Sequence, residues 1–154
     1  MSHRKGIAPA NYFEYAVYPL EGVWNIADES IWIEGAALDK ENLKFMLMIR
    51  QPDFVDESFA TEILLFTKKK KPHPLLEKVL FESIVEGLCV QMLHLGSYDS
   101  EPASFAKMTD FTASQNLKRI GHTHREIYLS DPRRSVSEKL KTVLRFRVES
   151  PANS

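Results

Sequence analysis

The sequence predicts an α+β fold with a mostly antiparallel sheet. Segments rich in apolar and β-branched residues alternate with two segments of helical periodicity, in the order strands, helix, strands, helix, strands. The last strand segment alternates apolar and basic residues, which is typical of an antiparallel strand with one buried face. A length of 154 residues and a hydrophobic content of 44% suit one globular domain with its own core.

The composition excludes several classes of protein. The formal net charge is −1, so the chain lacks the basic surface of a general nucleic-acid binder, and we expect no direct nucleic-acid partner. Cys89 is the single cysteine, which rules out an intramolecular disulfide and fits the reducing cytoplasm. No apolar run approaches the roughly 20 residues that span a bilayer, and the N-terminus lacks the apolar segment of a secretory signal. We therefore expect a cytoplasmic protein with no membrane partner.

The first part of the chain is expected to hold a tail and three strands. Residues 1–11 are polar and predict a disordered tail, ahead of a single domain over residues 12–149. Aromatic and β-branched residues predict a strand over residues 12–24 and a short one over residues 31–35. The run FMLMIR, residues 45–50, is almost continuously apolar and predicts a strand covered on both faces.

An apolar stripe at helical spacing predicts the first helix. The stripe consists of Val55, Phe59, Ile63 and Phe66. Pro52 and Asp53 stand ahead of it as a start signal. The lysines at 68–71 favour the helix C-terminus, and Pro72 ends the helix.

The second part of the chain repeats this alternation. Residues 79–87 and 88–96 predict two strands joined near Gly87. Ser100 and Pro102 then mark the start of a second helix. Its apolar stripe consists of Phe105, Met108, Phe111 and Thr112, and the helix is expected to end near Asn116.

Two further strands are predicted towards the C-terminus. HREIYLSD places Ile127 and Leu129 on one face and Glu126 and Tyr128 on the other. The segment LKTVLRFRVE forms the final strand. Its apolar side is expected to consist of Thr142, Leu144, Phe146 and Val148.

The stretch HTHREIYLSDPRR, residues 122–134, carries most of the candidate chemistry. His122, His124 and Glu126 at alternate strand positions resemble a two-histidine, one-carboxylate metal set. No second cluster in the sequence completes such a shell, so we expect no metal and no cofactor. The segment DPRR is expected to form the turn that ends the strand, with its arginines paired to surface acids.

Glu126 and Tyr128 are the stronger candidates. A carboxylate projecting from a sheet among aromatic side chains pairs with a cationic ligand, or acts as a general base on water if burial raises its pKa. The pattern alone is equally compatible with a solvated glutamate on an exposed sheet face. Cys89 and His94 are five residues apart and so on opposite strand faces, which argues against a catalytic pair.

Several motifs resemble the stand-alone bacterial branch of the GyrI-like small-molecule-binding family, over roughly residues 12–148. These motifs are YAVYPLEGVW, FMLMIRQPDFV, EGLCVQMLHLGSYDSEPASFAKM, HREIYLSDPRR and EKLKTVLRFRV. The resemblance implies a duplicated strand–helix–strand–strand fold that binds small amphipathic or cationic molecules in a groove. The glutamate of the family's E-I-Y strand corresponds to Glu126, at the centre of that groove.

The resemblance implies that aromatic residues surround this glutamate, and the sequence offers several candidates for the groove. The expected ligand-binding residues are Glu126, Tyr128, Trp24, Tyr98, Tyr18 and Met92, with Tyr15 and Trp32 as further candidate aromatics. Some members of this branch are hydrolases that open cyclopropane-bearing genotoxic compounds with water. If this chain shares that activity, the resemblance makes Glu126 and Tyr128 its catalytic residues.

One departure from the family pattern bears on the groove. Members of this branch have a strand and a helix ahead of the segment matching YFEYAVYPLEG, whereas only about eleven residues precede it here. We therefore expect an incomplete first repeat, an apolar sheet surface left uncovered, and a homodimer in which the second chain completes the groove.

Overall fold

The computed structural model describes residues 8–26 and 43–151, which fall into two compact units. Unit 1 comprises Met1–Tyr18 and Arg50–Val85, and unit 2 comprises Pro19–Ile49 and Glu86–Ser154. The predicted strand over residues 31–35, which includes Trp32, lies outside the described residues.

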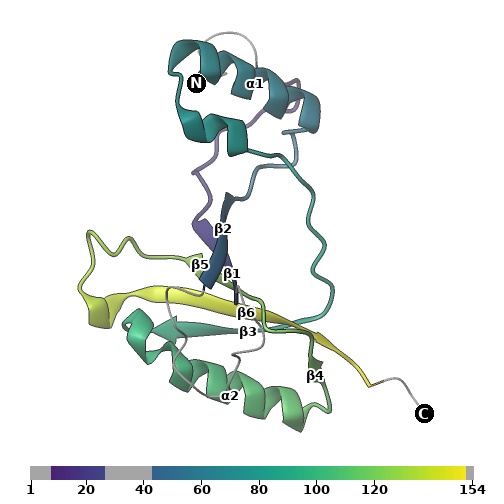
Figure 1. Ribbon diagram of the computed structural model, residues 1–154, viewed down its shortest axis with the longest axis vertical. Helices are drawn as coiled ribbons and strands as arrows, with labels where there is room; N and C mark the ends of the chain where they lie inside the picture. The colour runs from purple at the N-terminus through teal and green to yellow at the C-terminus, as the bar shows by residue number, and fades with distance from the viewer. Residues whose placement is uncertain (1–7, 27–42, 152–154) are drawn as a thin grey trace. The chain divides into compact units, whose positions relative to one another are not determined.

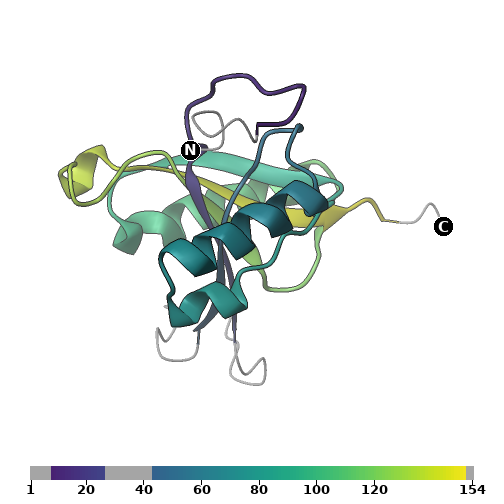
Figure 2. The ribbon, with the colours of Figure 1, turned by 90° about the horizontal axis from the view of Figure 1, so that it is seen from above.

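Unit 1 contains the first predicted helix. This helix, α1, spans Glu57–Lys70, and the 3₁₀ helix η4, Pro74–Lys78, lies beside it (Figure 1, Figure 2). The cap is Asp56, whose carboxylate accepts a hydrogen bond of 2.8 Å from the backbone N–H of Phe59. The lysines of the last turn lie where the helix dipole favours cations. The predicted helix is confirmed.

The strand predicted over residues 12–24 begins only at Leu20. Before it, the rings of Tyr12, Phe13 and Tyr15 pack around Phe54 of the same unit, at centroid distances of 5.3, 5.1 and 5.8 Å. These aromatic residues therefore form a local packing cluster and do not belong to a hydrogen-bonded β-strand. The prediction was wrong for residues 12–19 because β propensity reports packing more than backbone pairing.

Unit 2 is built on an antiparallel sheet, which confirms the predicted α+β class. Its strands are β1 (Leu20–Ile26), β2 (Leu43–Ile49), β3 (Cys89–Leu95), β4 (Lys118–Arg119), β5 (His124–Tyr128) and β6 (Lys141–Glu149). They pair in the order β2-β1-β5-β6-β3, with β4 on the end of β6. The run β3, α2, β5, β6 forms a complete strand–helix–strand–strand repeat, and β1 and β2 form a hairpin joined to it through β5.

Helix α2, Glu101–Ser114, covers the β3 and β6 side of this sheet (Figure 1). Its residue Met108 is buried in a core formed with Val90, Leu144, Phe146 and Val148. The alternation predicted for β6 is confirmed. Its inward side chains are 1, 0, 2 and 3% exposed for Thr142, Leu144, Phe146 and Val148.

Two apolar segments behave differently from their sequence pattern. FMLMIR forms β2, but β2 is an edge strand whose side chains at Phe45, Met46, Leu47 and Ile49 are 60, 55, 54 and 44% exposed. The prediction that both faces would be covered was wrong, whereas the expected uncovered apolar surface is present. The strand predicted over residues 79–87 is absent, and this segment pairs with no strand of the described chain.

Candidate functional site

The α2 side of the sheet presents a cluster centred on Glu126. In β5, His124, Glu126 and Tyr128 alternate with Arg125, so the two sets point to opposite faces. Glu126 is only 8% exposed. The buried carboxylate therefore excludes the interpretation of Glu126 as a solvated residue on an exposed sheet face.

Three side chains fix the position of the Glu126 carboxylate. His124 donates from Nε2 to Glu126 Oε1 at 2.9 Å, and the Tyr128 hydroxyl donates to Oε2 at 2.8 Å. Trp24 of β1 donates from Nε1 to the Tyr128 hydroxyl at 3.0 Å. Each Glu126 oxygen thus accepts one donor, an arrangement that suits a carboxylate rather than a carboxylic acid.

Gly22 makes room for this chain of hydrogen bonds. It pairs with Glu126 across the β1–β5 ladder. A Cβ at position 22 would lie 2.8 Å from Trp24 Nε1 and 3.0 Å from the Tyr128 hydroxyl oxygen, both closer than an ordinary contact. A glycine at this position therefore allows the indole of Trp24 to reach Tyr128.

Aromatic side chains extend from the cluster in both directions. Tyr98 contacts Tyr128 edge-on at 6.1 Å, and Trp24 contacts Phe45 at 5.2 Å. With the hydrogen bond between Trp24 and Tyr128, these rings form a row that runs from the 3₁₀ helix η5, Tyr98–Ser100, to β2. Tyr98 and Phe45 are 39 and 60% exposed, so the row ends in accessible aromatic surface.

A second acid, Glu101, adjoins Glu126. It is the first residue of α2 and is 8% exposed, and its Oε1 receives no hydrogen bond from the described residues. The pKa of Glu101 is raised from 4.5 to about 8, mainly by burial and then by the charge of Glu126 and a hydrogen bond with that carboxyl group. Burial and the neighbouring charge of Glu126 therefore both disfavour the ionised form of Glu101.

The two tyrosines of the site remain protonated donors. Burial, followed by the charge of Glu126 and the hydrogen bond to it, raises the pKa of the Tyr128 phenol well above its usual range. Burial and the nearby carboxylates also raise the pKa of Tyr98. Neither phenol is suited to act as a base, but the Tyr128 hydroxyl is well placed to donate.

The structure brings together part of the residue set predicted from the sequence. Trp24, Tyr98 and Tyr128 lie around Glu126, as described above. Met92 of β3 is partly buried against the core. Tyr18 belongs to unit 1, where its ring packs on Tyr15 at 6.1 Å and under the Arg50 guanidinium at 5.3 Å.

His124 lies on the predicted face of the strand, but it contacts Glu126 and does not belong to a metal set within the described part of the chain. It is the first residue of β5, 9% exposed, and its ring packs edge-on against Phe105 at 4.8 Å. Glu101 is a member of the cluster that the sequence pattern does not predict. The one local signal was an acid beside Pro102 at a helix start, which is common and is normally explained by the helix dipole.

The alternative chemistries weighed from the sequence have no counterpart among the described residues. No group of three potential ligands there is arranged to hold a metal ion. The Cys89 thiol contacts Glu86 and the carbonyl of Gly87, while His94 bridges the Ser104 hydroxyl and the carbonyl of Ser97 at 2.8 Å each. Cys89 and His94 thus have separate sets of contacts, as expected for two residues on opposite faces of β3.

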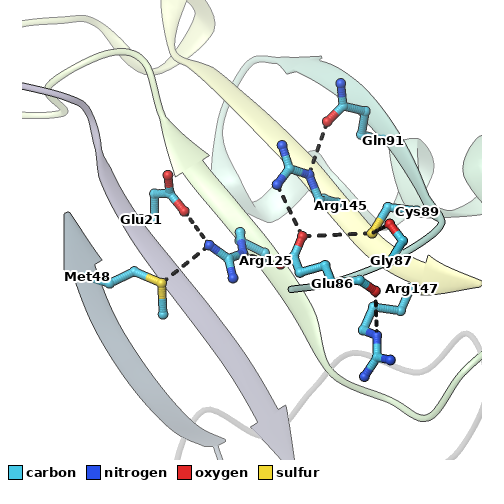
Figure 3. A network of polar contacts seen from close by, with 9 residues as sticks. All are labelled: Glu21, Met48, Glu86, Gly87, Cys89, Gln91, Arg125, Arg145 and Arg147. Atoms are coloured by element: carbon cyan, nitrogen blue, oxygen red, sulfur yellow. Dashed lines mark hydrogen bonds and ion pairs between the residues drawn. The ribbon is translucent and has the colours of Figure 1, made fainter. Parts of the chain in front are cut away.

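The opposite face of β5 carries a different polar cluster (Figure 3). Arg125 pairs with Glu21 of β1 at 2.6 Å and with Glu86 at 2.5 Å, and Arg145 of β6 pairs with Glu86 at 3.1 Å. A third arginine, Arg147, donates from Nε to the backbone carbonyl of Glu86 at 2.9 Å. Arg125 and Arg145 are each paired with an acid within the protein, so this network fixes the segment before β3 to the sheet.

The DPRR segment forms a turn, as predicted. Arg133 donates to the Asp131 carboxylate from Nε and from its terminal nitrogen, at 3.0 and 2.8 Å. These contacts lower the pKa of Asp131 to about 2. Arg133 is therefore paired with a surface acid.

Unit 1 contains a separate open hollow, lined by Lys68, Pro72, His73, Pro74 and Glu77. Lys68 and Glu77 form an ion pair of 2.9 Å, and His73 Nδ1 accepts from the backbone N–H of Leu75. Its polar groups are satisfied locally, and it holds no aromatic cluster. We therefore place the candidate site on unit 2.

Known proteins resemble this chain in sequence and in fold. The model of the GyrI-like small molecule binding domain matches residues 26–149. A crystal structure of a hydrolase from Listeria innocua has a TM-score of 0.82 and 33% identity, over 97% of this chain and 71% of that one. The crystal structure of a hydrolase encoded by lin2189 of the same organism has a TM-score of 0.81 and 34% sequence identity. The match covers 97% of this chain and 72% of that one.

An uncharacterized conserved protein from Listeria innocua is also similar, with a TM-score of 0.80 and 35% identity over 90% of this chain and 67% of that one. No curated protein matches the chain. Among the described residues, neither α-helix has the length and apolar character needed to cross a membrane.

Proposed function

This chain belongs to the GyrI-like small-molecule-binding family, and from that premise we propose that it binds small amphipathic or cationic molecules in an aromatic-lined groove centred on Glu126. The observation that carries the proposal is the buried Glu126 carboxylate. Within the described residues it receives hydrogen bonds from His124 and Tyr128 but pairs with no arginine or lysine.

A buried carboxylate without a permanent cation is costly in free energy. A ligand cation that replaces the missing charge recovers part of that cost. The aromatic row beside Glu126, which contains Trp24, Tyr128 and Tyr98, offers ring faces and edges to the apolar part of such a ligand. An amphipathic cation satisfies both features at once.

Titration with tetraphenylphosphonium, a lipophilic monocation, tests the proposal by calorimetry and thermal shift. We expect binding by the wild type and at least tenfold weaker binding by Glu126→Gln, which keeps the size of the side chain but removes its charge. Glu138→Gln removes a charge from an exposed residue and serves as the matched control. Equal affinity of Glu126→Gln and wild type would contradict the assigned role.

A second function is supported by the two similar Listeria innocua hydrolases. We propose as the alternative that the site opens cyclopropane-bearing genotoxic compounds with water. Glu126 takes a proton from water, the water oxygen attacks a ring carbon, and the breaking C–C bond passes its electrons to a conjugated carbonyl. The carbonyl oxygen takes up a proton from bulk water, and Glu126 returns its proton to bulk water, so that the net change is the addition of one water molecule. Tyr128 donates a hydrogen bond within the site and does not act as the base.

Ring opening is tested by incubating the protein with a cyclopropane-bearing alkylator whose ring is conjugated to a carbonyl. Mass spectrometry should find the water adduct at a rate above that of buffer, and Glu126→Gln should reduce the rate at least a hundredfold, as expected for loss of a general base. A rate equal to that of Glu126→Gln would remove the hydrolase alternative and leave the binding function standing.

A partner chain is the third element of the proposal. The uncovered apolar residues of β2 lie at the sheet edge and adjoin the aromatic row through Phe45. We propose that a second copy of the chain covers this edge and completes the groove, because exposed apolar edge strands favour pairing. Sedimentation velocity should give the mass of a dimer at micromolar concentration, and a monomer at all concentrations would contradict this.

A further inference from the structure

Glu101 and Glu126 form a pair of acids on facing elements of unit 2. Glu101 lies at the start of α2 and Glu126 in β5, and both are 8% exposed. Glu101 Oε1 is buried and has no hydrogen-bond partner among the described residues. The negative charge of Glu126 acts on Glu101 and raises its pKa, so two ionised carboxylates are disfavoured in these buried surroundings.

We propose that Glu101 holds this proton while the site is empty and releases it when a cationic ligand binds, so that the site exchanges a proton for a cation. This inference rests on the binding function proposed above. It adds Glu101 as a charge-regulating residue, and it makes the ligand affinity depend on pH.

The distribution of donors assigns the proton to Glu101 rather than to Glu126. Glu126 already accepts from His124 and Tyr128, one donor on each oxygen. Glu101 Oε1 is buried and receives no hydrogen bond from the described residues. A carboxylate oxygen left without a donor is costly, whereas a protonated carboxyl group supplies its own donor.

The surroundings of Glu101 disfavour its ionised form. The groups that act on it are the carboxylates of Glu126 and Asp99 together with burial, and each raises its pKa. Tyr98 in η5 and Tyr128 in β5 are neutral phenols. Two described histidines lie nearby: His124 is directed at Glu126, and buried His94 contacts the hydroxyl groups of Ser100 and Ser104, on either side of Glu101 in the chain.

The exchange conserves charge in the site. Before binding, the two carboxyl groups carry one proton and one negative charge. The ligand brings one positive charge next to them, which favours ionisation of Glu101. The proton leaves Glu101 for bulk water, and the complex holds two carboxylates and the cation. No other bond forms or breaks.

Calorimetry with tetraphenylphosphonium measures this release directly, because the probe has no titratable proton. Binding enthalpies at pH 7 are compared in phosphate and in Tris, whose ionisation enthalpies differ, and the difference gives the number of protons released. With a pKa of about 8 for Glu101, about nine in ten molecules hold the proton at pH 7. We expect about 0.9 proton released per cation at pH 7 and about 0.1 at pH 9.

Two variants identify the source of the proton. Glu101→Gln mimics the neutral acid and is expected to bind without proton release, and its affinity should not change with pH. His124→Gln removes the other titratable donor on Glu126 and should keep the release. In the wild type the affinity should rise about tenfold between pH 6 and pH 7, as expected for loss of one proton on binding.

Each outcome decides the matter. Release in the wild type and its loss in Glu101→Gln support the exchange. Binding by the wild type without release at pH 7 overturns the exchange while the binding function stands. Release that persists in Glu101→Gln and disappears in His124→Gln overturns the assignment to Glu101. Failure of the wild type to bind the cation overturns the binding function and the exchange together.

Discussion

Replacing Gly22 by alanine should disrupt the site without changing any charged or aromatic residue. The new Cβ would lie 2.8 Å from Trp24 Nε1 and 3.0 Å from the Tyr128 hydroxyl oxygen, whereas ordinary contacts begin near 3.4 Å. The indole must therefore move away by about half an ångström or more. The hydrogen bond between Trp24 and Tyr128, now 3.0 Å long, would lengthen or break.

The expected loss of stability in Gly22→Ala has two contributions. Loss of the hydrogen bond accounts for about 0.5–1.5 kcal/mol, and overpacking adds about 1 kcal/mol because the partly buried indole can shift. We expect Gly22→Ala to lower the free energy of unfolding by about 2 kcal/mol and the Tm by roughly 4–8 °C. The Tyr128 hydroxyl also loses the hydrogen bond that it accepts from Trp24, so the affinity of the Glu126 site for a cation should fall.

Tryptophan fluorescence detects the change at the site itself. In a Trp32→Phe background Trp24 is the sole tryptophan, and its emission should shift and become more accessible to iodide in Gly22→Ala. Gly87→Ala is the matched control. Its positive φ of 72° strains an alanine, but no atom lies within 4 Å of the added Cβ, so stability should fall while emission stays the same. Unchanged emission and cation affinity in Gly22→Ala would refute the steric argument.

Three further predictions concern other parts of unit 2. Glu86→Gln removes the acid shared by Arg125 and Arg145 and should lower the urea midpoint by an amount equivalent to about 1–3 kcal/mol, below the value for a fully buried pair because these side chains remain 12–27% exposed. Because the folded-state pKa of Glu101 is raised to about 8 from 4.5, the folded chain keeps a proton that the unfolded chain loses above pH 4.5. Urea unfolding should therefore show stability falling from pH 5 to pH 8, by at most ~1.4 kcal/mol per pH unit, and Glu101→Gln should lack this fall. Leu47→Lys, on the exposed edge strand β2, should shift any dimer to monomer in sedimentation velocity.

The sequence correctly predicted the helices and strands whose signals all lie within one short segment of the chain. Helix α1 has its stripe, its basic last turn and its following proline within one segment, and β6 shows its buried face by alternation alone. The segment VLFESIVEG has an equally apolar pattern, yet it forms no strand. A strand requires a ladder partner, and sequence periodicity does not report whether an edge is available.

The candidate site shows the same limit. The alternation in HREIY correctly places His124, Glu126 and Tyr128 on one face, because that relation is local. The contact of Glu101 with Glu126 joins a helix start to a strand about 25 residues later. Only the packing of α2 on the sheet creates it. The pattern around Glu101 is that of an ordinary first helical turn, so no periodicity could have selected this acid.

The two faces of β5 argue for the sign of the ligand charge. On one face Arg125 pairs with Glu21 and shares Glu86 with Arg145, so that both acids are paired with arginines of the sheet. On the other face, two acids meet only neutral or weakly basic donors among the described residues. A bound anion would add a third negative charge beside Glu126 and Glu101, in surroundings that screen poorly. A cation instead compensates the carboxylate and takes over the role of the Glu101 proton. One face of β5 therefore carries ion pairs within the protein. The other face carries an unbalanced negative charge, for which a small cation is the complementary ligand.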